Sequence, residues 1–275
     1  MLYLNKKEIN VERFPDGTPR IKLDRSLIKP TNTIGWFFEN IEELFILQCL
    51  CGELKCGENV LYLPYIPNAR QDRAETETSV CTLKYFAEVI NSLNFKEVYA
   101  LTPHSRASFD YIDNLKEIEF TKILDSAIEI IKQYNEIHIL FLPDKGAKTQ
   151  FEPKLHKYDL PILYGEKHRD FSTGKITKYS IDGDVEGKNI LIIDDICSYG
   201  GTFLKASKLL KELGAKDISM FVSHCENSIL KGSLMECWNI KTIVTTNSLL
   251  KEEELIPDKQ YKLNILNIKG DAYEI

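Results

Sequence analysis

The chain of 275 residues is 43% hydrophobic and 28% charged, a composition that suits a folded protein of about two domains. Its net charge of −6 argues against nucleic acid as the main partner, although a nucleotide needs only local positive charge. No apolar run is long enough to span a membrane, and the start lacks a signal-peptide layout, so we expect no membrane partner. Seven cysteines without a secreted framework favour a cytoplasmic protein.

Apolar strand-like segments alternate with amphipathic helix-like segments along the chain, which predicts an α/β fold. The expected helices are Phe38 to Leu54, Thr82 to Leu93 and Ile123 to Tyr134. The expected strands are Val60 to Tyr65, Glu97 to Leu101, His138 to Leu142, Leu160 to Tyr164, Ile190 to Ile193, Ile218 to His224, Thr242 to Thr246 and Leu263 to Ile268. Ligands of such folds bind at the carboxyl ends of the strands, so polar residues after a strand are candidate site residues.

The first candidates lie after the strand Val60 to Tyr65, where Arg70, Gln71 and Arg73 offer many hydrogen-bond donors. A guanidinium group suits bidentate phosphate contact and stacking on a purine. A solvated charged loop is the alternative for this stretch alone. Nearer the start, Phe14 and Asp16 lie in a turn-rich segment that says little by itself.

Further candidates follow the next strands. His104 comes just after Glu97 to Leu101, and Asp144 comes just after His138 to Leu142. A polar segment runs from Glu166 to about Gly187 and carries Lys167 and Arg169. We interpret it as a mobile flap whose cations would stabilise a phosphoryl transition state, with a loose surface loop as the alternative.

The most informative stretch is NILIIDDICSYGGTF, which begins at residue 189. A short apolar run predicts a buried parallel strand, and Asp194 and Asp195 follow it. The small-residue loop after this pair precedes an amphipathic helix and consists of Ser198, Tyr199, Gly200, Gly201 and Thr202. Glycines let backbone N–H groups approach an anion at a helix N-terminus, and carboxylates accept hydrogen bonds from vicinal hydroxyls. The stretch therefore predicts a sugar-phosphate site, with a purely structural strand–turn–helix as the alternative.

This stretch looks like the signature of type I phosphoribosyltransferase folds, which bind ribose 5-phosphate or phosphoribosyl pyrophosphate (PRPP). Taken in order, the motifs resemble those of ribose-phosphate pyrophosphokinase, the PRPP synthetase family, over about residues 12 to 270. The most specific match is Pro64-Tyr65 followed by Ala69-Arg70-Gln71-Asp72-Arg73, which resembles the family's ATP-binding motif.

The resemblance implies a role for each candidate. Phe14 and Asp16 would belong to a loop that reaches the adenine of a neighbouring subunit's ATP, which implies at least a homodimer. His104 would lie near magnesium and the ATP phosphates, and Asp144 would be linked to magnesium. Lys167 and Arg169 would be catalytic. The acidic pair and the loop that follows it would bind the ribose phosphate: Asp194, Asp195, Ser198, Tyr199, Gly200, Gly201 and Thr202.

The family's fold implies two similar α/β domains, residues 1–119 and 120–275, each a mostly parallel sheet flanked by helices, with the active site between them. The implied reaction transfers the diphosphoryl group of Mg-ATP to a ribose C1 hydroxyl and releases AMP, in nucleotide biosynthesis or NAD metabolism. Alternatives are a PRPP-dependent phosphoribosyltransferase and a non-catalytic binding subunit. Ser198 and Tyr199 replace an aspartate and a threonine of the family's 5-phosphate loop. This change favours an extended acceptor such as ADP-ribose over ribose 5-phosphate, because Tyr199 would open one wall of the phosphate cup.

Overall fold

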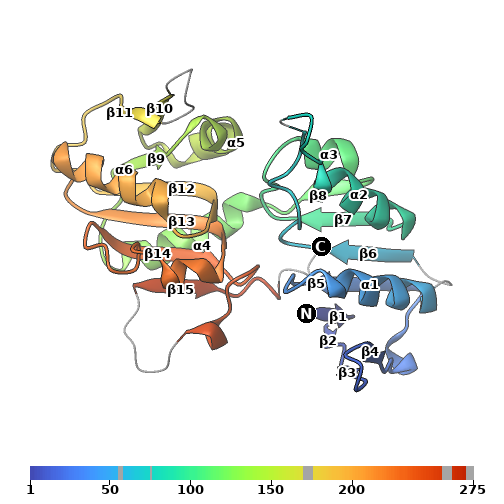
Figure 1. The fold of residues 1–275 in the computed structure, drawn as a ribbon. Coiled ribbons are helices and arrows are strands. Elements are labelled where there is room, and N and C mark those ends of the chain that lie inside the picture. Colours follow the sequence, from blue (N-terminus) through green and yellow to red (C-terminus); the bar gives the residue numbers. More distant parts are fainter. Residues whose placement is uncertain (55–57, 75, 170–175, 256–261, 271–275) are drawn as a thin grey trace. The chain divides into compact units, whose positions relative to one another are not determined.

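The computed structural model describes residues 1–54, 58–74, 76–169, 176–255 and 262–270, with backbone only for 167–169 and 176–178. These residues form two compact units (Figure 1). The first is Met1–Ile118 together with the segment that begins at Ile268, and the second is Glu119–Asn267. The expected second domain ran to the end of the sequence, whereas the segment from Ile268 groups with the first unit.

The first unit contains a six-stranded sheet of order β2-β1-β5-β6-β7-β8 within its described residues. The pairs from β5 to β8 are parallel, and β1 runs antiparallel to both of its neighbours. The strands are β1 (Leu2–Leu4), β2 (Lys7–Glu8), β5 (Thr31–Trp36), β6 (Glu58–Tyr62), β7 (Glu97–Ala100) and β8 (Leu115–Glu117). The helices are α1 (Glu42–Glu53), α2 (Thr82–Ser92) and α3 (Ala107–Tyr111), with a 3-10 turn at Arg25–Leu27. A separate hairpin is formed by β3 (Val11–Arg13) and β4 (Pro19–Ile21).

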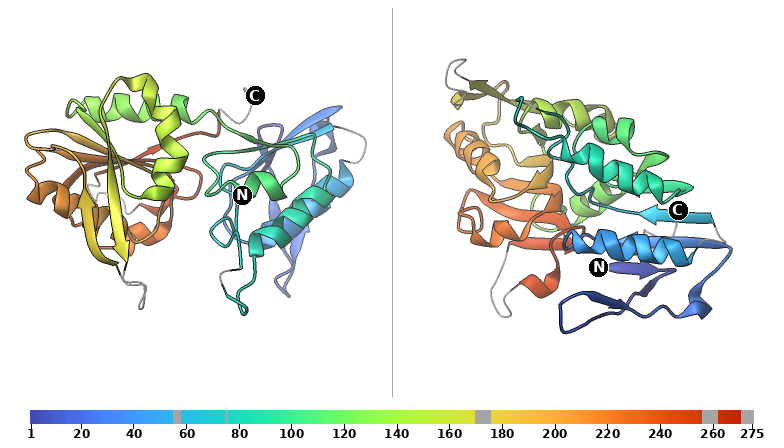
Figure 2. Two further views of the ribbon diagram at one scale, coloured as in Figure 1. Left: turned by 90° about the horizontal axis from the view of Figure 1, so that it is seen from above. Right: turned by 45° about the vertical axis from the view of Figure 1, so that its right-hand side comes forward.

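Helices α1 and α2 pack on one face of this sheet (Figure 2), where Trp36, Leu47 and Phe86 are buried in one core. The other face carries a row of aromatic rings, Tyr3, Phe37 and Tyr62, with centroids about 6 Å apart. Trp36 and the next residue, Phe37, fill opposite faces because successive side chains of an extended segment point in opposite directions. The Tyr62 hydroxyl donates to the Ile268 carbonyl at 3.3 Å, which ties the returning segment to this face.

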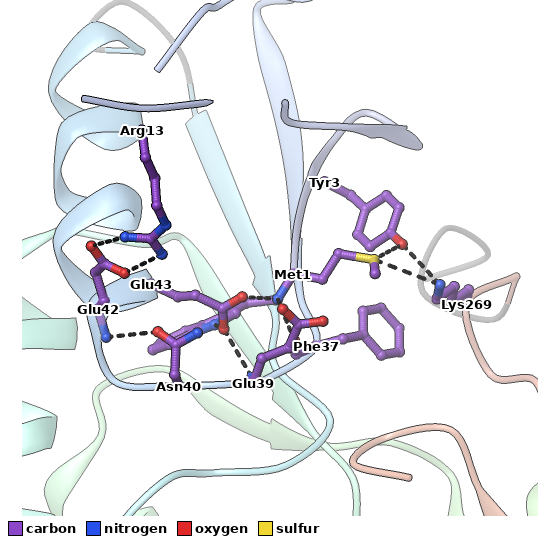
Figure 3. A network of polar contacts seen from close by, with 10 residues as sticks. Met1, Tyr3, Arg13, Phe37, Glu39, Asn40, Glu42, Glu43 and Lys269 are labelled. Carbon is purple, nitrogen blue, oxygen red and sulfur yellow. Dashed lines mark hydrogen bonds and ion pairs between the residues drawn. The ribbon is translucent and has the colours of Figure 1, made fainter. Parts of the chain in front are cut away.

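The carboxyl end of β5 is held by the buried carboxylate of Glu43 (Figure 3). Its oxygens accept from the Trp36 indole N–H at 2.8 Å, from the Glu39 backbone N–H at 2.9 Å and from the Met1 ammonium group. Lys269 donates to the Tyr3 hydroxyl at 2.8 Å in the same view. A buried carboxylate is stable when its oxygens are paired in this way, so Glu43 fixes the path between β5 and α1.

The second unit contains a seven-stranded sheet of order β11-β10-β9-β12-β13-β14-β15 within its described residues. All neighbours are parallel except β10 and β11. The strands are β9 (Ile139–Leu142), β10 (Ile162–Arg169), β11 (Ile176–Ile181), β12 (Ile190–Cys197), β13 (Ile218–Cys225), β14 (Ile240–Thr246) and β15 (Leu263–Leu266). The helices are α4 (Phe120–Lys132), α5 (Lys145–Leu155) and α6 (Gly201–Glu212), with 3-10 turns at His156–Tyr158, Asn227–Lys231 and Glu252–Glu254.

Helices cover both faces of this sheet, with α4 and α5 on one face and α6 on the other (Figure 2). Phe120 of α4 packs on Phe151 of α5 and Phe221 of β13, with ring centroids 4.8 and 5.9 Å apart. On the other face, Phe203 and Leu210 of α6 share a core with the strands. Burial of both faces explains the continuous apolar run of β12, and the predicted mostly parallel α/β fold is confirmed.

Several element boundaries differ from the sequence prediction. Helix α1 begins at Glu42 rather than Phe38, because residues 31–36 form β5 and the Asn40 side chain accepts from the Glu42 N–H at 3.1 Å. Strand β12 continues to Cys197, past the acidic pair, because β13 pairs with it as far as Cys225. The polar segment after Tyr164 is a hairpin of β10 and β11 where the structure describes it.

Among the described residues, no helix has the length and hydropathy to cross a bilayer.

Candidate active site

The loop between β12 and α6 has the geometry of an anion cradle. Gly200 precedes α6 with a φ of +82°, a left-handed conformation that favours glycine. An added Cβ at Gly200 would lie 2.6 Å from the Leu234 side chain, so packing also requires glycine there. No side chain caps the N-terminus of α6, and the first N–H groups of a helix have no partner within it. The loop Ser198–Thr202 therefore presents backbone donors at the positive end of a helix dipole.

The acidic pair lies inside β12, immediately before this loop. Strand β9 pairs with β12 only as far as Ile192, so one edge of β12 is released just before Asp194. Asp195 is buried, and its N–H donates to Oδ1 of Asp194 at 2.9 Å. Burial, followed by the charges of Asp195 and Asp144, raises the pKa of Asp194 well above 3.8. This carboxyl is therefore held at an energetic cost, as is typical of functional sites.

Asp144 lies at the carboxyl end of the neighbouring strand β9. It is the N-cap of α5, and its Oδ1 accepts from the Ala147 N–H at 3.0 Å. Its charge contributes to the raised pKa of Asp194, so the fold brings Asp144, Asp194 and Asp195 to one region of the sheet edge. In the described part of the chain, no group of three or more His, Cys, Asp or Glu side chains is arranged to hold a metal ion. Bound phosphate oxygens would have to complete such a site.

The flap candidates Lys167 and Arg169 lie at the end of β10, and their side chains are outside the described residues. Lys167 pairs in register with Tyr179 of β11. The Tyr179 hydroxyl donates to the Pro143 carbonyl at 2.9 Å, directly before Asp144. Gly165 leaves the room for this contact, because an added Cβ would lie 2.0 Å from that hydroxyl. Tyr179 thus anchors the hairpin to the carboxyl end of β9.

In the first unit, the predicted ATP motif forms a turn between β6 and α2. Ala69 is buried and anchors the turn, whereas Arg70, Gln71 and Arg73 are exposed. The side-chain oxygen of Gln71 accepts from the Thr82 hydroxyl at 3.0 Å. The backbone carbonyl of Gln71 accepts from the Leu83 N–H at 3.3 Å. Strand β6 ends at Tyr62, before the expected Tyr65. The two arginines are therefore displayed on a turn that is fixed to the start of α2.

The remaining candidates of this unit are exposed. Phe14 is 48% exposed at the tip of the β3–β4 hairpin. The Asp16 carboxylate accepts from the Thr18 hydroxyl and N–H, at 2.7 and 3.0 Å, and these bonds lower the pKa of Asp16. Arg13 makes a bidentate ion pair with Glu42, which fixes the hairpin to α1. His104 lies after β7 on the surface.

Sequence reasoning missed two residues beside the cradle, Tyr179 and Glu226. Tyr179 supports the flap hairpin, and Glu226 accepts hydrogen bonds from the hydroxyls of Ser198 and Ser228. The contacts of Tyr179 with Pro143 and of Glu226 with Ser198 join positions far apart in the sequence, so no local pattern predicts them. Two glycines carry a weak signal in the sequence, because Gly165 and Gly232 mark places where another segment approaches the backbone closely.

These features define a phosphoribosyltransferase-type fold with a candidate anion cradle between β12 and α6. The family model for the phosphoribosyl transferase domain matches residues 112–254, more than half of the chain. A solved structure of phosphoribosylpyrophosphate synthetase from Mycobacterium smegmatis has the same fold, with a TM-score of 0.78 at 21% identity over 97% of this chain and 88% of that one.

Two ribose-phosphate pyrophosphokinases are similar to this chain over most of its length. The ribose-phosphate pyrophosphokinase of Corynebacterium ammoniagenes is 29% identical over 96% of this chain and 84% of its own length. That of Saccharolobus solfataricus is 26% identical over 86% of this chain and 82% of its own length. The chain belongs to the ribose-phosphate pyrophosphokinase family, a family of diphosphotransferases within the phosphoribosyl transferase fold.

Proposed function

We propose that the protein transfers the diphosphoryl group of Mg-ATP to the C1 hydroxyl of a ribose 5-phosphate moiety. The C1 oxygen attacks the β-phosphorus of ATP, the bond from that phosphorus to the bridging α,β-oxygen breaks, and AMP leaves. The hydroxyl proton is released to solvent or to a phosphate oxygen. This reaction needs in-line positioning and charge stabilisation rather than a covalent intermediate on the enzyme.

The observation that carries this proposal is the position of Asp194 and Asp195 directly before the cradle Ser198–Thr202. An acceptor with its 5-phosphate on the N–H groups at the start of α6 would place its hydroxyls toward the two carboxylates. Carboxylates accept hydrogen bonds from vicinal hydroxyls, and helix N-termini bind phosphate. A ribose phosphate satisfies both requirements with one small molecule.

The other candidates take roles that suit their chemistry. Arg70 and Arg73 are exposed guanidinium groups on a fixed turn, as contacts to ATP would need. Lys167 and Arg169 would stabilise charge on the transferring group. Asp144 fits magnesium, which prefers oxygen ligands and usually keeps substrate phosphates in its shell. The imidazole of His104 fits a phosphate oxygen better than magnesium. Bound magnesium would offset charge on the ATP phosphates.

For the acceptor, we favour an extended ribose phosphate such as ADP-ribose over ribose 5-phosphate. Tyr199 is 61% exposed and stands where the family has a threonine, so its hydroxyl is not positioned as a cap for a terminal phosphate. The 5-phosphate of ADP-ribose is half of a diphosphate and itself carries one charge fewer than a terminal phosphate, so it needs fewer donors in the cradle. The exposed ring of Tyr199 offers a stacking surface for the group beyond the diphosphate.

The test measures AMP formation from Mg-ATP with ribose 5-phosphate or ADP-ribose as acceptor. AMP that depends on an acceptor is the expected result. A kcat/KM at least about tenfold higher for ribose 5-phosphate, unchanged in Tyr199→Thr, would refute the extended acceptor and leave PRPP synthesis. The variants Lys167→Ala and Arg169→Ala should lower kcat by about 10²–10³-fold. The control Lys208→Ala, on the surface of α6, should keep wild-type turnover.

The same assay separates the alternatives. A PRPP-dependent phosphoribosyltransferase would form no AMP and would release diphosphate from PRPP and a base. A non-catalytic subunit would do neither. We also propose at least a dimer in which Phe14 reaches the neighbouring subunit's ATP, because its ring is exposed at a hairpin tip. Specific activity should then fall on dilution, and a fully active monomer would contradict this arrangement.

A further inference from the structure

The segment that follows β13 forms a wall against the phosphate loop. The Glu226 N–H donates to the Cys197 carbonyl at 2.9 Å, which continues the pairing of β12 and β13 to the edge of the loop. Further along, Gly232 packs on the backbone of Tyr199, and an added Cβ at Gly232 would lie 2.4 Å from the Tyr199 carbonyl oxygen. The backbone of Glu226 is thus fixed beside Ser198 and Tyr199.

The side chain of Glu226 is directed at the loop. Its Oε2 accepts from the Ser198 hydroxyl and, at 3.1 Å, from the Ser228 hydroxyl. A serine hydroxyl has one proton, so while it donates to Glu226 it is not a donor to a bound phosphate. Glu226 therefore removes one donor from the cradle and adds one negative charge beside it.

A carboxylate at this place acts unequally on different phosphates. A terminal phosphate is close to a dianion at neutral pH, because its second pKa is about 6. In ADP-ribose the corresponding phosphate is half of a diphosphate and carries one charge, while the second charge lies one phosphate further from the same carboxylate, so the repulsion is weaker. The loss of the Ser198 donor also matters more to a terminal phosphate, which has three oxygens to satisfy.

We propose that Glu226 is a specificity-determining residue of the ribose-phosphate site: it holds the Ser198 hydroxyl and disfavours a terminal 5-phosphate relative to a 5-phosphate that is substituted, as in the diphosphate of ADP-ribose. The inference rests on the proposed function, since it names what the same cradle selects. The inference concerns the ratio of kcat/KM for the two acceptors. It applies whichever acceptor the wild-type protein prefers. Glu226 acts on the ligand through Ser198 and through charge, so it is a positioning residue.

The test compares kcat/KM for ribose 5-phosphate and ADP-ribose in variants of Glu226. Glu226→Gln keeps an oxygen that can accept from both serines and removes the charge. The ratio of ribose 5-phosphate to ADP-ribose should rise by about three- to tenfold, through the acceptor KM, with KM for ATP unchanged. Glu226→Ala should shift the ratio in the same direction, whereas Glu226→Asp keeps the charge and should restore the wild-type ratio. Glu236→Gln removes an exposed charge from the same segment and should change nothing.

A merely structural role would give a different pattern, in which Glu226→Gln, Glu226→Ala and Glu226→Asp all lower kcat/KM for both acceptors by the same factor. That pattern, or a ratio unchanged in Glu226→Gln and Glu226→Ala, would overturn the inference. Titration calorimetry with ribose 5-phosphate and ADP-ribose in the absence of ATP measures the ratio of the two dissociation constants, which should shift in the same direction. If no acceptor yields AMP, the proposed reaction fails, yet the calorimetric ratio still supports or refutes the role of Glu226.

Discussion

Replacing Asp194 by Asn should stabilise the second unit while it impairs the proposed ribose-phosphate site. Burial and the charges of Asp195 and Asp144 raise the pKa of Asp194, so its ionised form is costly in the folded protein. Asn has nearly the same shape, and its amide oxygen can still accept from the Asp195 N–H, now at 2.9 Å from Oδ1. The substitution thus removes the charge and keeps the hydrogen bond.

Relief of the like charges sets a minimum for the gain, and relief of the burial cost, the larger cause of the raised pKa, adds to it. At an effective dielectric constant of about 20–40, two unit charges within about 10 Å repel by at least roughly 1 kcal/mol, so we expect a gain of about 1–2 kcal/mol. For a unit of this size such a gain corresponds to a rise in Tm of about 2–8 °C. Activity should move in the opposite direction, with kcat/KM for the acceptor lowered by about 10–100-fold, because a carboxylate accepts hydrogen bonds from ribose hydroxyls more strongly than an amide does.

The gain should depend on pH with a defined sign. Because the folded-state pKa of Asp194 is raised, the folded protein holds this proton more tightly than the unfolded chain does. Ionisation therefore costs no stability below the ordinary pKa of 3.8, where the group is protonated in both states, and costs the full amount above the raised pKa. The difference in Tm between Asp194→Asn and the wild type should vanish well below pH 3.8 and should grow as the pH rises above that value.

Differential scanning calorimetry at several pH values measures this difference. The matched control is Glu212→Gln, which removes one exposed charge from α6 and should change stability by less than about 0.5 kcal/mol. A Tm for Asp194→Asn that equals or falls below the wild-type value at pH 8 would show that Asp194 is not held at a cost. A gain that does not change between pH 4 and pH 8 would exclude the electrostatic explanation.

Two further predictions concern the first unit. Arg70→Ala and Arg73→Ala should each raise KM for ATP by about tenfold, with a smaller effect on KM for the acceptor. An unchanged KM for ATP in both variants would show that this turn does not bind ATP. Glu43→Ala should destabilise the unit by about 2–4 kcal/mol in denaturant unfolding, because the Trp36 indole N–H would lose its buried partner. Glu42→Ala breaks an exposed pair and should cost much less than Glu43→Ala; equal losses for both would contradict the importance of burial.

Local sequence determined the strand–loop–helix order around the cradle. The apolar run before Asp194 forms a strand because a segment buried on both faces must be apolar throughout. Gly200 adopts the left-handed conformation that a tight entry into α6 requires, and few other residues tolerate it. These are properties of single residues and their neighbours in the chain, so they can be predicted without the fold.

The ends of the elements were decided by tertiary structure. The sequence suggested that β12 stops at Ile193, but a strand lasts as long as a neighbour pairs with it, and β13 continues to Cys225. The sequence prediction assigned no element to residues 31–37 and placed Phe38 at the start of a helix, so it missed β5. Pairing with β1 and β6 assigns residues 31–36 to the sheet, and α1 starts only at Glu42.

The electrostatic character of the site also depends on the fold. The sequence identified Asp144 and Asp194 as separate candidates, but only the parallel pairing of β9 with β12 brings their charges close enough to raise a pKa. Tyr179 and Glu226 had no local signal, because each contacts the site through a bond between segments about 30 residues apart or more. Sequence determines which chemical groups are available to a site, whereas distance and burial, which set their free energies, exist only once remote strands have paired.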